Sequence, residues 1–97
     1  MTAPTPRLLA RIKRDYPPGS WERVVEELEA IPDNDHAYTQ DRERIQAALV
    51  LMGRGDWHRF NHGLELLRTD WRDLLMGAGL GHGDWREVLD LELPRPN

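Results

Sequence analysis

Each of the four tryptophans in this chain stands in the same local setting. Each follows a serine or an aspartate and comes three positions before an apolar residue, in units that begin at Ser20, Asp56, Asp70 and Asp84. Serine and aspartate are favourable N-cap residues, because a side-chain oxygen accepts a hydrogen bond from a first-turn N–H group. Residues three and four positions apart share one face of a helix. The pattern therefore predicts four capped helix starts, each with its indole ring on the buried face.

Apolar spacing and chain breakers predict the remaining helix bounds. An apolar stripe from Leu8 to Tyr16 has helical spacing, opens after Pro6 and stops before two prolines. No segment shows sustained alternation of apolar and polar residues, so strands are not expected. The sequence predicts an all-α fold, a single compact domain of five to six short helices at about residues 6–16, 20–31, 40–53, 57–68, 71–78 and 85–91.

The helix at residues 40–53, with Thr39 as its expected N-cap, is the predicted centre of the domain. Between Ile45 and Met52 only one residue is polar, and a helix that is apolar on most sides is usually buried on most sides. Gly63 lies inside the following helix, where glycine costs about 1 kcal/mol relative to alanine. A close helix crossing at Gly63 would explain this choice.

A chain of 97 residues fits one domain. We expect a flexible tail at residues 1–6, a helical domain at 7–93, in which Leu93 packs, and a C-terminal tail at 94–97. The absence of cysteine excludes disulfides, thiol catalysis and cysteine-based zinc sites. No apolar run approaches the roughly 20 residues of a membrane span, and the N-terminus lacks a signal-peptide layout. A cytoplasmic protein with no membrane partner is therefore expected.

The net charge of −4 argues against nucleic-acid binding, which needs a concentrated basic surface. The helices at 71–78 and 85–91, joined by a glycine-rich turn, superficially suggest a helix-turn-helix reader, which is the third functional hypothesis. The last helix offers Arg86 alone as a base, and its acids should repel phosphate: Asp84, Glu87, Asp90 and Glu92. The one basic cluster is small and is expected to face water: Arg7, Arg11, Lys13 and Arg14.

The second functional hypothesis is a metal site on the helix at 57–68. His58 and His62 lie four positions apart, which places both imidazoles on one helix face, and Glu65 extends that face. The set His58, His62 and Glu65 could hold zinc or a similar divalent metal. The histidine pair lacks the intervening glutamate of zinc proteases, and two solvated histidines explain the same spacing.

Motifs for catalysis are missing from the chain. Ser20 is the one serine and is explained as a helix cap, and no pair of carboxylates is marked out as desolvated. The leading hypothesis is therefore a non-enzymatic helical interaction module that binds a protein partner or a second copy of itself.

The run from Leu67 to Leu75, with Ala78-Gly79-Leu80 and Asp84-Trp85 after it and residues 44–48 before it, resembles a family of small uncharacterised bacterial all-α proteins. The similarity covers most of residues 7–92. It implies a self-contained helical domain and brings no activity, cofactor or binding residue with it.

Overall fold

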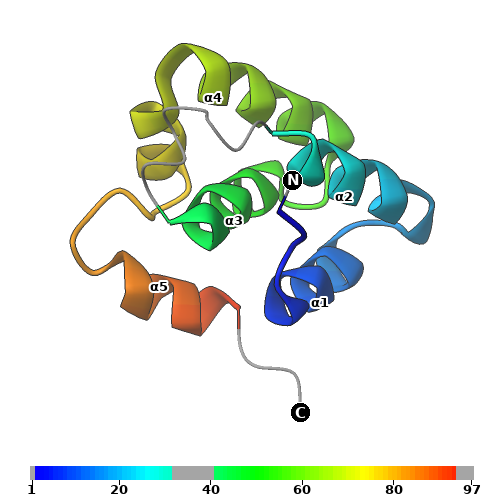
Figure 1. Cartoon of the computed structure of the whole chain (residues 1–97), viewed down its shortest axis with the longest axis horizontal. Helices are drawn as coiled ribbons and strands as arrows, with labels where there is room; N and C mark the ends of the chain where they lie inside the picture. The colour runs from blue at the N-terminus through cyan, green and yellow to red at the C-terminus, as the bar shows by residue number, and fades with distance from the viewer. Residues whose placement is uncertain (1, 32–40, 94–97) are drawn as a thin grey trace.

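Five α-helices and one short 3₁₀ helix make up the part of the chain that the computed structural model describes, residues 2–31 and 41–93 (Figure 1). No strand occurs in these ranges, so the all-α prediction is confirmed. None of these helices is long and apolar enough to cross a membrane. The elements in chain order are α1 (Pro6–Asp15), η1 (Pro18–Ser20), α2 (Trp21–Glu29), α3 (Arg42–Gly53), α4 (Trp57–Gly77) and α5 (Trp85–Glu92).

The central helix is α3, as its apolar composition predicted. It contacts α1, α4 and α5, and Figure 1 shows it in the middle of the molecule with α4 across the top. Most of its side chains are buried, including those of Arg44 and Gln46. The helix begins after Asp41, whose carboxylate accepts a hydrogen bond of 3.1 Å from the Arg44 N–H group. Thr39, the predicted cap, lies outside the described residues.

The helices predicted at 57–68 and 71–78 form one element, α4, with a kink at Asp70. This residue is extended (φ −159°, ψ 88°), and its carboxylate accepts hydrogen bonds from the N–H groups of Arg72 (3.2 Å) and Asp73 (3.4 Å). Asp70 therefore caps the second half of α4 as predicted. This single extended residue divides α4 into two helical halves, at the boundary that the sequence predicted.

The prediction of a close crossing at Gly63 is confirmed. A Cβ atom at this glycine would lie 3.3 Å from the Leu49 side chain of α3. The missing side chain allows α3 and α4 to approach closely, which positions the ends of both helices. Leu93, beyond α5, is fully buried and packs as expected.

The backbone before each helix decides which caps form. Thr5, Asp41 and Asp56 are extended, and the side chain of each accepts a hydrogen bond from a first-turn N–H group. Ser20 and Asp84 do not cap, so the prediction for them is wrong. Both have ψ near zero (−7° and 14°), because each already belongs to a tight turn that precedes its helix. In this conformation neither side chain bonds to a first-turn N–H group.

The four tryptophans pack against the core, as predicted, but their rings are only partly buried. The side chains that follow three positions later are fully buried in three of the four units: Val24, Phe60 and Leu74. A first-turn position lies at the end of a helix, where the ring reaches only the rim of the core. Cations lie over these rings: Lys13 over Trp21, Arg23 over Trp57, Arg72 over Trp71, and both Arg44 and Arg86 over Trp85.

The segment before α1, predicted as a tail, contacts α3. The Thr2 carbonyl accepts a hydrogen bond of 2.8 Å from Gln46, and the Thr2 hydroxyl accepts one of 2.9 Å from Arg42. The Thr5 hydroxyl bonds to Glu43. Residues 2–5 are therefore connected to the central helix. The C-terminal tail predicted at 94–97 lies outside the described residues.

Candidate functional site

The predicted metal ligands lie on the exposed side of α4. His58 and His62 line one hollow of about 340 Å³ together with Met52 and Arg59. Glu65 is exposed and does not line this hollow. Among the described residues, no three histidine, aspartate or glutamate side chains form a group that could hold a metal ion. The structure thus brings the two histidines together and leaves the predicted third ligand outside.

A groove with an apolar floor runs between α1 and α2. We call it the α1–α2 groove; it has a volume of about 400 Å³ and is lined by Leu9, Lys13, Trp21, Glu22, Val25, Glu26 and Glu29. The apolar side chains among these, from both helices, are half-buried.

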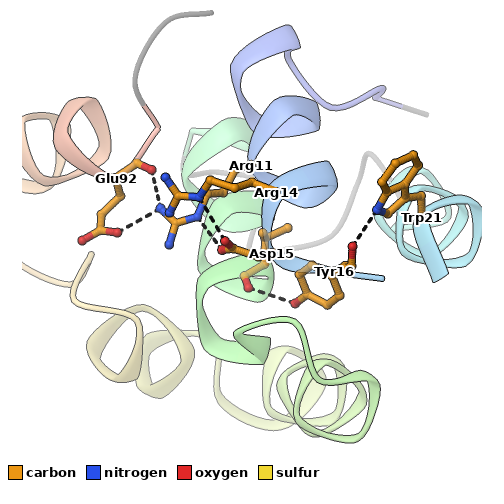
Figure 2. Close-up of polar contacts among 7 residues, drawn as sticks. Arg11, Arg14, Asp15, Tyr16, Trp21 and Glu92 are labelled. Carbon is orange, nitrogen blue, oxygen red and sulfur yellow. Dashed lines mark hydrogen bonds and ion pairs between the residues drawn. The ribbon is translucent and has the colours of Figure 1, made fainter. Parts of the chain in front are cut away.

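Trp21 is held in place at the α1–α2 groove. Its indole N–H donates a hydrogen bond of 2.7 Å to the Tyr16 carbonyl, as Figure 2 shows. The Tyr16 hydroxyl in turn donates to the Val50 carbonyl of α3 at 2.9 Å. The exposed part of the indole face is therefore presented at a fixed angle. A rigid aromatic of this kind contributes contact area at low entropic cost.

The charge around the α1–α2 groove is negative. Glu22, Glu26 and Glu29 stand against Lys13 alone, which leaves two negative charges uncompensated. Within the described ranges none of these glutamates makes an ion pair. Glu22 and Glu26 are four positions apart, and like charges at this spacing destabilise a helix by about 0.2–0.5 kcal/mol. Glu29 ends α2 at the negative pole of the helix dipole, which is also unfavourable.

Two arginines of α1 join α1 to α3 and α5, contrary to the expectation that the basic cluster faces water. Arg7 pairs with Glu43 at 2.5 Å and with Asp90 at 2.7 Å. The hydrogen bonds from Arg7 lower the pKa of the Glu43 carboxyl below its ordinary value. Arg11 pairs with Asp15 at 2.5 Å and with Glu92 at 3.1 Å, as seen in Figure 2. The acids of α5 thus hold that helix to α1.

Arg44 was not indicated by any sequence pattern beyond its place beside the apolar run of α3. Its guanidinium is buried and donates two hydrogen bonds to the Leu80 carbonyl, at 2.9 and 2.7 Å. It also lies over the Trp85 ring at 4.8 Å. Arg44 therefore has a structural role: it fixes the loop between α4 and α5.

A larger hollow lies where α1, α3, α4 and α5 end. We call it the arginine hollow; it has a volume of about 630 Å³ and is lined by Arg11, Asp15, Leu51, Met52, Arg54, Arg59, Gly77, Ala78 and Glu92. Among these residues, Arg11 forms ion pairs with both Asp15 and Glu92. The exposed guanidinium groups of Arg54 and Arg59 make no hydrogen bond or ion pair with any residue in the described ranges.

Arg54 lies in the left-handed region of backbone space (φ 48°, ψ 39°) at the C-cap of α3. This conformation costs an L-residue roughly 1–2 kcal/mol, and helices usually place glycine there. A cation at a helix C-terminus gains about 0.3–1 kcal/mol from the dipole. The dipole therefore offsets only part of the strain, and no hydrogen bond or ion pair of the guanidinium with residues 2–31 or 41–93 offsets the rest.

Comparisons with protein-family models, with curated proteins and with solved structures find no match to this chain. The resemblance to the bacterial helical family stays a prediction, and the function is argued from the surfaces alone.

Proposed function

We propose that this protein is a non-enzymatic interaction module whose α1–α2 groove binds a basic amphipathic helix of a partner protein. The observation that carries the proposal is an apolar floor beside three glutamates that lack internal partners in the described structure. A helix seated in a groove places apolar side chains on the floor and its flanking residues at the rim. Lysines or arginines on those flanks would meet Glu22, Glu26 and Glu29.

The electrostatic balance of α2 supports a basic partner in particular. The glutamates repel one another, and Glu29 opposes the helix dipole. The repulsion between the glutamates and the unfavourable position of Glu29 at the helix C-terminus both become weaker when cations approach. Binding of a basic partner therefore relieves destabilisation that is already present in the free protein. The same charges disfavour self-association through this groove, because two copies would bring glutamates against glutamates.

A labelled helical peptide of leucine and lysine in an amphipathic repeat tests the proposal on the full chain. We expect saturable binding in fluorescence anisotropy and none for the matched peptide of leucine and glutamate. The variant Glu22→Lys/Glu26→Lys should weaken binding by about tenfold or more, since it reverses two rim charges. Val25→Gln, which makes the floor polar, should also weaken it.

The matched control is Glu65→Lys, which reverses an exposed charge on α4, away from the α1–α2 groove. This variant should bind the leucine–lysine peptide nearly as well as the wild type. For a comparison at equal charge change, Glu65→Lys is measured beside the single variant Glu26→Lys, and equal losses for the two would show unspecific attraction to an acidic protein. That result, or no binding by the wild type, would refute the proposal.

A second candidate function, metal binding, is supported by the hollow that His58 and His62 share. The other residues that line this hollow, Met52 and Arg59, offer zinc no favourable ligand, so the two imidazoles would bind zinc together with water. Zinc should raise the melting temperature if the folded state binds it specifically, and His58→Ala/His62→Ala should abolish the rise. His82→Ala, in the loop before α5, serves as the control. An unchanged melting temperature of the wild type in zinc would exclude this function.

A further inference from the structure

We infer that the arginine hollow binds a small organic anion with two or more negative charges, such as a phosphate ester or a polycarboxylate. This site is independent of the proposed peptide binding, because its lining shares no residue with the α1–α2 groove. It borders the hollow of His58 and His62, with which it shares Met52 and Arg59. It lies where four helices end, beyond the C-cap of α3. The inference depends on its size, its charge and the backbone of Arg54.

The size suits a small molecule. A volume of about 630 Å³ falls within the range of roughly 300–1,000 Å³ that is typical of ligand sites. Leu51, Met52 and Ala78 provide an apolar surface for the carbon part of a ligand. Charged side chains at the margins would orient its polar groups.

The arginine side chains, rather than the helix ends, favour an anion. Three arginines and two acids line the hollow, a sum of +1 on a chain whose net charge is −4. The C-terminal ends of α1, α3, α4 and α5 border the hollow and carry partial negative charge, so an anion there must be held by the arginine side chains themselves. The acids Asp15 and Glu92 are already bonded to Arg11, and Asp15 also pairs with Arg14 at 3.2 Å (Figure 2).

The two guanidiniums without partners in the described structure lie outside that paired group. Arg59 has Asp56 as a neighbouring charge, but that carboxylate already accepts hydrogen bonds from two backbone N–H groups. Arg54 and Arg59 are therefore free to bind carboxylate or phosphate oxygens, which guanidinium groups hold with two parallel hydrogen bonds.

The backbone of Arg54 adds an independent observation. Arg54 has a strained, left-handed backbone at a position that usually holds glycine. Its guanidinium has no partner within the described structure. Backbone strain of this kind concentrates at functional sites. An external anion supplies the partner that the fold does not.

The test uses the full chain with three probes: inorganic phosphate, pyrophosphate and citrate, each titrated by calorimetry and by thermal shift at constant ionic strength. We expect pyrophosphate and citrate to bind and to raise the melting temperature more than phosphate. Arg59→Gln should weaken binding by about tenfold or more. Arg54→Gly should weaken it similarly and at the same time raise the melting temperature without a probe, because glycine relieves the strain.

The control is Arg68→Gln, which removes an exposed arginine of α4 outside the hollow. Affinity for pyrophosphate should then change less than about twofold, in keeping with the modest energy of exposed charges. Equal losses for Arg68→Gln and Arg59→Gln would indicate a general charge effect and overturn the inference. No saturable binding of any probe by the wild type would overturn it as well.

Discussion

Replacement of Gly53 by alanine tests how α1, α3 and α4 are fitted together. A Cβ atom at Gly53 would lie 2.1 Å from the Tyr16 hydroxyl oxygen and 3.1 Å from the Phe60 Cβ. Tyr16 and Phe60 are buried and meet edge to face, with ring centroids 6.2 Å apart. The Tyr16 hydroxyl must therefore leave its hydrogen bond to the Val50 carbonyl when the methyl group is added.

The cost of Gly53→Ala follows from three terms. A buried hydroxyl that loses its partner costs about 1–3 kcal/mol. Repacking around an added methyl group costs about 1–3 kcal/mol. The greater helix propensity of alanine returns up to about 1 kcal/mol. We expect the free energy of unfolding to fall by about 1–6 kcal/mol.

A second substitution separates the hydroxyl contact from general crowding. Tyr16→Phe should cost about 1 kcal/mol alone, because the Val50 carbonyl still accepts a hydrogen bond from the Arg54 N–H group. In this background the new methyl group of Gly53→Ala occupies space that the hydroxyl has left. The added cost should then be about 1 kcal/mol or less, with the remainder due to the close Phe60 Cβ.

Urea denaturation followed by circular dichroism measures all four proteins of this cycle. Gly83→Ala is the control, because a Cβ atom there meets nothing within 4 Å; its effect should stay within about 0.5 kcal/mol. If Gly53→Ala costs the same in both backgrounds, the Tyr16 hydroxyl is not what the methyl group displaces and the reasoning is wrong.

Two further outcomes concern the rim of the core and the ion pairs. From the sequence alone, Trp71→Ala is expected to cost about 3–5 kcal/mol, as for a fully buried aromatic. In the structure the ring is half-buried, so water fills part of the space that the substitution vacates. The expected loss of unfolding free energy, measured by urea denaturation, is therefore lower, about 1–3 kcal/mol. A loss below about 1 kcal/mol would mean that the ring does not pack on the core. Hydrogen bonds from Arg7 lower the pKa of the Glu43 carboxyl in the folded protein below its unfolded value, near 4.5. The ionised carboxylate therefore stabilises the folded state above that unfolded pKa, and this stabilisation is lost as the pH falls through the lower pKa of the folded state. Glu43→Gln should therefore flatten the plot of stability against pH below about pH 4.5, and an unchanged slope would contradict a depressed pKa.

Helix positions could be read from the sequence because the signals that set them are local. Each of these signals determines the backbone only within one or two helical turns. They are the prolines at 17 and 18, the apolar stripe of α1 and the aspartates at 56 and 70. The composition of residues 45–52 also predicted that α3 is central, because a helix without a polar face is buried on most sides. Gly63 indicated a close helix crossing for a similar reason. Glycine destabilises a helix interior, and a helix that packs closely against that position explains why glycine stands there.

Contacts between distant segments could not be read in the same way. Whether Ser20 and Asp84 cap their helices depends on the turn before each, and whether an indole is buried depends on where its helix end meets the core. The histidines at 58 and 62 share a hollow because they lie one helical turn apart. Met52 lines the same hollow only because α3 packs against α4 in the folded protein.

The difference is clearest among the arginines, which look alike in the sequence. Arg7 and Arg11 are committed to acids on α3 and α5, and Arg44 to a loop carbonyl, whereas Arg54 and Arg59 face a hollow without a partner in the described structure. Local sequence determined the helices that carry these side chains, because hydrogen bonds and apolar spacing act over a few residues. Only the tertiary structure decided which charges are satisfied, because ion pairs depend on distances between helices that are far apart in the chain.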